Sequence, residues 1–190
     1  MPPRRFVFDD PSRFTVGTVG EPGNRSFYLQ ARQGRAVLSV ALEKVQVALL
    51  ADRMGTLLDE VNRRGLAELP ELPPPDERDT APLDEPVVGI FRVGTLALAW
   101  DADQSGVLVE ARAETDDDDV DEEAMRAFTD DGGDDGPDLI RLRISPRMAA
   151  AFIERARRVV AAGRPPCPLC GLPLNPEGHV CPRGNGTLLN

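Results

Sequence analysis

Several residue types are scarce in this 190-residue chain, and each scarcity limits the fold or the chemistry. The chain has one Trp, one Tyr and seven Phe, so aliphatic side chains must fill most of any core. The longest apolar stretch, residues 36–50, is interrupted by polar side chains and is shorter than the roughly 18 to 20 residues that span a bilayer. The N-terminus lacks the apolar segment of a signal peptide. We therefore expect a cytoplasmic protein with no membrane partner.

Histidine is scarcer still, since His179 is the only one in the chain. An H-E-x-x-H metalloprotease site, which needs two histidines, is therefore excluded. The glycine-rich phosphate-binding motifs and the G-x-S-x-G nucleophile motif are missing as well. The sequence favours a non-catalytic protein, and an enzyme of unrecognised class is the least favoured hypothesis.

The formal net charge of −10 is distributed unevenly along the chain. Residues 114–138 carry 13 acidic side chains and a single arginine, whereas residues 139–190 carry eight arginines and two acidic side chains. An acidic block of this kind repels itself and has little to bury, so we expect a disordered, solvated insertion. A calcium site is the alternative, but the spacing of an EF-hand loop is absent.

The chain contains similar segments in its two halves. Residues 14–18 (FTVGT) resemble residues 91–95 (FRVGT), and each is followed by turn formers, two more β-type runs and a helical pattern. The β-type runs are residues 27–32 and 36–42 in the first half and residues 107–112 and 139–144 in the second. We predict an α+β fold in which two β-β-β-α units, a candidate internal duplication, form a mainly antiparallel sheet covered by two helices. An extra strand near residues 5–8 precedes the first unit. The expected segments are residues 1–64 (first unit), 65–86 (proline-rich acidic linker), 87–163 (second unit, with the 114–138 insertion) and 164–190 (tail).

The second predicted helix has a clear start and two distinct faces. Ser145 is suited to the N-cap, and the proline after it to the first helical position. Apolar side chains recur at helical spacing on one face, and the opposite face carries Arg147, Glu154, Arg155 and Arg158. We interpret the apolar face as a core face and the charged face as solvent-exposed.

All three cysteines and the only histidine fall within fifteen residues: Cys167, Cys170, His179 and Cys181. Their spacing is C-x2-C-x8-H-x-C. Three thiolates and one imidazole suit a tetrahedral Zn²⁺ ion, and four protein ligands favour a closed structural site over a catalytic one. The sequence therefore predicts a small zinc ribbon or knuckle in the tail. A redox C-x-x-C pair and a disulfide are less favoured alternatives.

The same residues carry a resemblance to a known family. The segment CPLCGLPLNPEGHVCPRGNG, which follows a helix ending in VVAAGRP, and the opening FDDPSRFTVGTVG resemble an uncharacterised actinobacterial family, domain of unknown function 3090, over the full chain. The resemblance implies the zinc-binding role of the four residues. It also implies a genomic setting beside a phosphoinositide-kinase-like protein and a histidine-phosphatase-like protein. It supplies no activity and no catalytic residues.

Two classes of function are favoured over an enzyme of unrecognised class. The favoured one is a zinc-binding adaptor whose partner is another protein, with the kinase-like or phosphatase-like neighbour as a candidate. The alternative is a nucleic-acid-binding zinc-ribbon protein, which would contact phosphates through the arginine-rich C-terminal segment. The overall negative charge argues against this alternative. Its candidate contact residues are Arg147, Arg155, Arg158, Arg164 and Arg183.

Overall fold

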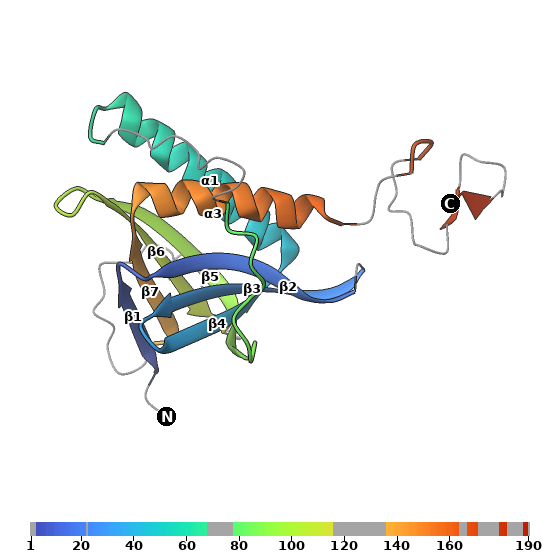
Figure 1. The fold of residues 1–190 in the computed structure, drawn as a ribbon, viewed down its shortest axis with the longest axis horizontal. Coiled ribbons are helices and arrows are strands. Elements are labelled where there is room, and N and C mark those ends of the chain that lie inside the picture. The colour runs from blue at the N-terminus through green and yellow to red at the C-terminus, as the bar shows by residue number, and fades with distance from the viewer. Residues whose placement is uncertain are drawn as a thin grey trace.

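A computed structural model of the chain consists of a seven-stranded sheet with two helices on one face (Figure 1). It describes residues 3–21, 23–67, 78–115, 136–163, 167–170, 179–181 and 188–189. The elements are β1 (Arg5–Asp9), β2 (Arg13–Glu21), β3 (Asn24–Gln33), β4 (Ala36–Leu42), α1 (Lys44–Arg63), β5 (Gly89–Asp101), β6 (Gly106–Ala113), β7 (Leu139–Ile144), α3 (Pro146–Ala161), β8 (His179–Val180) and β9 (Leu188–Leu189). The α+β prediction is confirmed.

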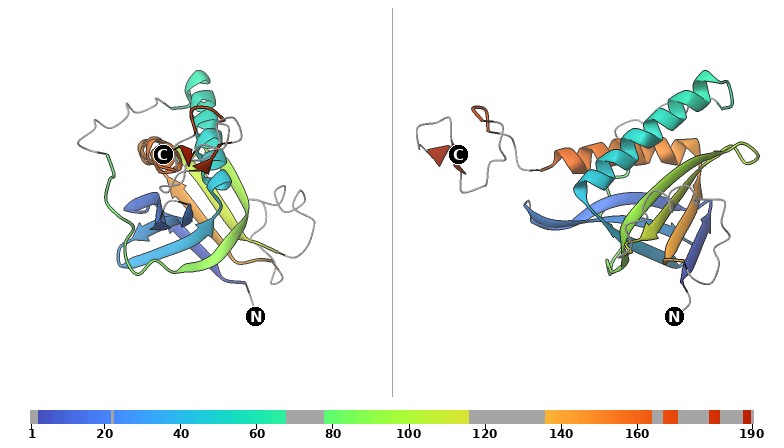
Figure 2. Two further views of the ribbon diagram at one scale, coloured as in Figure 1. Left: turned by 90° about the vertical axis from the view of Figure 1, so that its right-hand side faces the viewer. Right: turned by 180° about the vertical axis from the view of Figure 1, so that it is seen from behind.

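The sheet has the strand order β1-β7-β6-β5-β4-β3-β2. Neighbouring strands are antiparallel except at β1/β7 and β4/β5, which are parallel. Strands β1 and β2 form opposite edges of the sheet, yet only residues 10–12 separate them in the chain. The sheet therefore curls until its two edges approach one another, as Figure 2 shows. The order β-β-β-α occurs twice after the extra strand, while a common origin of the two units stays a prediction.

Local sequence explains where the strands and helices form. In β3, Phe27, Leu29 and Ala31 alternate with more polar residues, and this period of two places all three in the core. Helix α3 begins as predicted, because the Ser145 side chain accepts a hydrogen bond from the backbone N–H of Met148. Among the described residues, no helix combines the length and apolarity needed to cross a membrane.

The two units share one hydrophobic core. Helix α3 packs on β2, the first strand of the first unit, and α1 packs on α3 and on β5, the first strand of the second unit. The rings of Phe14 on β2 and Phe152 on α3 are stacked with centroids 4.6 Å apart. Buried residues from β1 through α3 belong to a single cluster. Because each helix covers a strand of the other unit, neither unit closes a core by itself.

Residues 78–88, which we call the strap, include residues 78–86 of the predicted linker and cross β2 and β3 (Figure 1). The guanidinium of Arg13 donates to the Asp79 carboxylate at 3.0 Å, and Gln30 exchanges two hydrogen bonds with the backbone of Asp84 at 2.7 and 3.0 Å. From the helix side, Arg155 donates to the carbonyl oxygens of Asp79 and Ala81 at 2.6 and 2.8 Å. The strap is thus fixed to the sheet, whereas linker residues 68–77 lie outside the described residues.

The acidic insertion begins and ends at neighbouring points of the sheet. Residues 116–135, which include most of its acidic side chains, lie outside the described residues. At its two ends, the backbone N–H of Ala113 donates to the carbonyl of Asp138 at 2.8 Å. The Asp138 carboxylate also pairs with Arg4, and these hydrogen bonds hold the pKa of Asp138 below its usual value. The insertion therefore starts and finishes within one β6–β7 connection.

Candidate metal centre

The first half of the centre is a turn that carries two cysteines. Residues 167–170 form this turn soon after the end of α3. Cys167 is buried, with 2% of its surface exposed, whereas Cys170 is half-buried. Between them, Leu169 is 47% exposed. The turn therefore presents its sulfurs inward and an apolar side chain outward.

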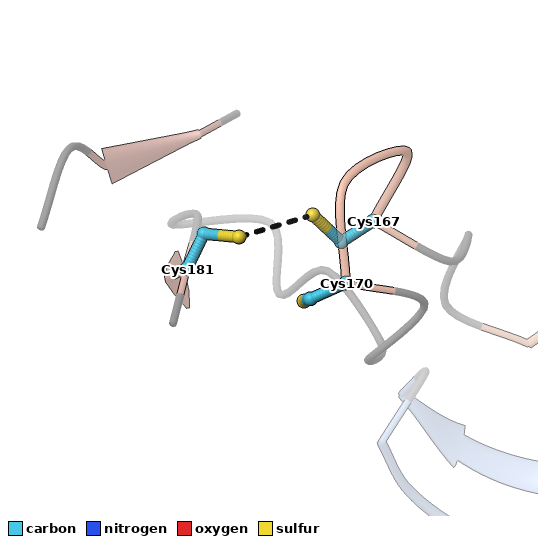
Figure 3. Close-up of side chains that lie close together, drawn as sticks. All are labelled: Cys167, Cys170 and Cys181. Carbon is cyan, nitrogen blue, oxygen red and sulfur yellow. Dashed lines mark hydrogen bonds between the residues drawn. The ribbon is translucent and has the colours of Figure 1, made fainter. Parts of the chain in front are cut away.

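The second half comes from a short hairpin. Strand β8 pairs antiparallel with β9, with His179 opposite Leu189 and Val180 opposite Leu188. Cys181 follows β8 directly and is 1% exposed. This pairing fixes the backbone just before Cys181, and its sulfur lies opposite that of Cys167 (Figure 3).

The three sulfur atoms lie in a cluster whose size fits one metal ion. All three Sγ atoms are within 4.8 Å of one another, and those of Cys167 and Cys181 are 3.8 Å apart. Thiolates bound tetrahedrally at the usual Zn–S distance of about 2.3 Å stand about 3.8 Å from each other. A disulfide would need about 2.05 Å. The spacing matches two corners of a zinc tetrahedron, and the cysteine set fits the predicted ion.

The fourth predicted ligand is only partly described. The backbone of His179 belongs to β8, but its imidazole lies outside the described residues. In extended backbone, residues two apart point to the same side of the strand, so the position of His179 relative to Cys181 suits a shared ligand site. Ligation by His179 stays a prediction.

The arginines proposed to contact nucleic acid differ in their burial and in their hydrogen-bond partners. Arg155 is buried rather than solvent-exposed: besides its two bonds to the strap, it donates to the carbonyl of Val16 at 2.6 Å. Burial is the main cause that lowers the pKa of Arg155, and the nearby Asp79 carboxylate opposes the shift. Arg158 pairs with Glu154 and also donates to the carbonyl of Asp79 at 2.8 Å.

The other arginines of that set lie near the start of α3 or outside the described residues. Arg147 is exposed at the opposite end of α3, near its first turn. Arg164 and Arg183 lie outside the described residues. Of the described arginines in the predicted nucleic-acid surface, Arg155 is therefore buried, whereas Arg147 and Arg158 lie on the surface of one helix.

The family comparison agrees with the sequence resemblance. The family described as "Protein of unknown function (DUF3090)" matches residues 6–181. The chain belongs to this DUF3090 family. The match ends on Cys181, so it includes all four predicted ligands of the centre. No curated protein and no solved structure matches the chain.

Membership places the cysteine centre within the family's own region of the chain rather than in an appended tail. The DUF3090 match also spans both helices and, apart from Arg5 at the start of β1, the first seven strands. Three of the four ligands predicted from the C-x2-C-x8-H-x-C spacing are brought together. Leu169 is the surface feature that the spacing did not indicate. The signal for it was an apolar residue enclosed by two cysteines in a segment otherwise rich in Pro and Gly.

Proposed function

We propose that this DUF3090 protein is a non-catalytic zinc-binding adaptor, in which Cys167, Cys170, His179 and Cys181 hold a structural Zn²⁺ that shapes the C-terminal tail for docking. The observation that carries the proposal is the cluster of three sulfurs within 4.8 Å. With three thiolates and one neutral imidazole, the loaded centre would carry a net charge near −1. Four protein ligands leave no open position for a reacting water, which favours a structural role.

Metal binding would supply most of the folding energy of the tail. Cys167 and Cys181 are buried, but neither belongs to the core cluster shared by the sheet and helices. The described cysteine segments lie beyond the end of α3, apart from the sheet (Figures 1 and 2). Structural zinc sites contribute apparent binding free energies of about 10 to 16 kcal/mol in small peptides. A segment with so little core of its own depends on that contribution for a fixed shape.

The docking role rests on the exposed side chain at the centre. Leu169 is 47% exposed on the turn between Cys167 and Cys170, so a loaded centre would hold an apolar contact in a fixed position. A partner that buries this side chain would remove apolar surface from water, which favours association. The kinase-like and phosphatase-like proteins expected in the genomic neighbourhood are the partners we propose to test first.

Metal content tests the first half of the proposal. The full chain, purified under reducing conditions, is expected to contain one Zn²⁺ per chain by elemental analysis and native mass spectrometry. Cys170→Ser removes one ligand and is expected to lose zinc. Leu169→Ser alters the same turn without removing a ligand and is the matched control that keeps zinc. A reduced wild-type chain that binds no zinc would reject the metal centre.

Binding of a partner protein tests the second half of the proposal, the docking role. Native mass spectra of the tagged chain, isolated gently from its own cells, are expected to show a complex with one further protein. Leu169→Ser should weaken that complex although its zinc content is unchanged, and Cys170→Ser should abolish it. If Cys170→Ser retains the partner with no zinc bound, the tail is not the docking element. Retention of nucleic acid in place of a protein would favour the alternative function.

A further inference from the structure

The three cysteines of the centre differ in their exposure to solvent. Cys167 and Cys181 are 2% and 1% exposed, whereas Cys170 is half-buried. Peroxides oxidise thiolates that are accessible, and an oxidised sulfur forms a disulfide most readily when a second thiol lies beside it. Cys170 suits both conditions, because it is the least buried of the three residues and its Sγ lies within 4.8 Å of two buried thiol sulfurs. Figure 3 shows the three side chains converging from two segments of the chain.

We propose that the cysteine centre is a peroxide-sensitive redox site in which Cys170 is oxidised first and then forms a disulfide with a neighbouring buried cysteine, releasing the zinc. This inference rests on the proposed function, since it needs a zinc-loaded centre. The co-reactant is hydrogen peroxide. The outcome would be a reversible loss of tail structure, and with it a loss of docking under oxidising conditions.

The chemistry balances in two steps on sulfur. The Cys170 thiolate attacks one peroxide oxygen, the O–O bond breaks and hydroxide leaves, which gives a sulfenic acid on Cys170. The thiolate of Cys167 or Cys181 then attacks that sulfur, and the S–O bond breaks as a second hydroxide leaves. Two thiolates have together given two electrons to the peroxide, and solvent protonates the two hydroxides to water. One cysteine and His179 remain, which is too few ligands to retain the ion.

The geometry allows this step without a rearrangement of the sheet. A disulfide of about 2.05 Å requires the Cys170 sulfur to approach its partner by less than about 3 Å, starting from a separation within 4.8 Å. Cys170 belongs to a short turn, and Cys181 directly follows a two-residue strand, so both segments are small. The chain has no other cysteine, and the core cluster contains none of these three. The effect of oxidation is therefore confined to the tail.

The test uses the full chain, reduced, loaded with zinc and freed of excess metal. Hydrogen peroxide is added in steps, zinc release is followed with a chromogenic chelator, and intact mass and peptide maps are recorded at each step. We expect zinc release to parallel the loss of two hydrogen atoms per chain, and the peptide map to show a disulfide that contains Cys170. Dithiothreitol with added zinc is expected to restore both the mass and the metal.

Two substitutions separate Cys170 from its neighbours. Cys170→Asp offers a carboxylate ligand that peroxide cannot oxidise, and it is expected to slow zinc release at least tenfold. Cys167→Asp is the matched control, because it leaves the accessible Cys170 beside Cys181 and is expected to release zinc at close to the wild-type rate. If either variant fails to load zinc, the mass and zinc measurements on the wild-type chain still test whether Cys170 forms a disulfide as zinc is released.

The outcomes distinguish this inference from the proposed function. A zinc-loaded chain that keeps its metal and mass, at peroxide concentrations that oxidise free cysteine, overturns the redox site and leaves the zinc centre in place. A disulfide that joins Cys167 to Cys181 without Cys170 also overturns it. A reduced chain that never binds zinc rejects the proposed function itself, whatever its thiols do.

Discussion

Glu110 holds a carboxylate almost out of reach of solvent in the middle of β6. Its side chain is 1% exposed, and its two oxygens accept hydrogen bonds of 2.7 Å from the Nε atoms of Arg112 and Arg141. Arg141 lies directly opposite Glu110 on β7, and Arg112 lies two residues along β6 on the same face. The cost of removing the carboxylate from water is offset by this pair of charged partners.

Removal of that charge should therefore be strongly destabilising. We expect Glu110→Gln to lower the free energy of unfolding by about 3 to 5 kcal/mol, because two largely buried guanidinium groups lose the carboxylate they share. The measurement is urea denaturation followed by the fluorescence of Trp100, the single tryptophan. Glu60→Gln is the control: its partners Arg63 and Arg64 are exposed, so less than about 1 kcal/mol should be lost. Equal losses for the two variants would contradict the burial argument.

Asp79 makes the stability of the fold depend on pH. Burial opposes ionisation of its carboxyl, but the hydrogen bond from Arg13 and the charge of Arg155 outweigh burial and hold the pKa of Asp79 below its usual value. A pKa that is lower in the folded state stabilises the fold above the unfolded-state pKa, near pH 4, and this contribution is lost as pH falls through the folded-state pKa.

We therefore expect the free energy of unfolding to decline as pH falls below about 5, and less steeply in Asp79→Asn than in the wild type. At neutral pH, Asp79→Asn should be less stable by about 1.5 to 3 kcal/mol, because Arg13 and Arg155 lose a charged acceptor. Denaturation curves recorded across this pH range provide the measurement. Parallel pH profiles for the two proteins would show that Asp79 is not the group responsible.

The elements that the sequence predicted correctly are those with local signals. The strands at residues 36–42 and 139–144 and the helix start at Ser145 depend on neighbours within a few residues, and all three are observed. The ligand cluster was predictable for the same reason, since its cysteines fall within fifteen residues.

Features that join distant parts of the chain could not be predicted in this way. Strand β1 was expected before the first unit, but its pairing with β7, with Arg5 opposite Leu139, has no local signal. Arg155 was assigned to the exposed face of its helix because the amphipathic pattern contains no information about the strap that covers it. The 3.8 Å separation of Cys167 and Cys181 likewise depends on the β8–β9 pairing and not on spacing alone.

The strap packs on β2 where a glycine leaves room for it. A Cβ atom added at Gly17 would lie 2.7 Å from the Cγ of Leu83, whose side chain is 8% exposed. We expect Gly17→Ala to destabilise the protein by about 1 to 3 kcal/mol, because the strap must move away from the strand. Leu83→Ala removes the clashing atoms but also loses buried contacts.

A double-mutant cycle separates the clash from other effects of these substitutions. In Gly17→Ala/Leu83→Ala the added methyl group meets no leucine, so the loss of stability should be smaller than the sum of the two single losses by more than about 0.5 kcal/mol. Urea denaturation of the four proteins gives the coupling energy. Additive losses would indicate that Gly17 is required for a reason other than contact with the strap.

The molecule as a whole consists of one body with a separate cysteine centre. In the body, the helix of each half packs on a strand of the other half, so we expect the body to unfold as one cooperative unit. The cysteines lie outside the core cluster. We therefore expect a metal bound at the centre to stabilise the tail and not the body.

Removal of the metal should affect the two parts differently. We expect a chelator, added to the reduced full chain, to leave the thermal midpoint and Trp100 emission of the body unchanged, because none of its core contacts involves the cysteines. The tail should become susceptible to limited proteolysis after residue 163, since it loses the ligand bonds that fix it. A chain truncated after Gly163 is the control for the body alone and should unfold at the same temperature. Unfolding of the whole protein on chelation would instead mean that the centre supports the sheet, and that the tail transmits its metal state to the body.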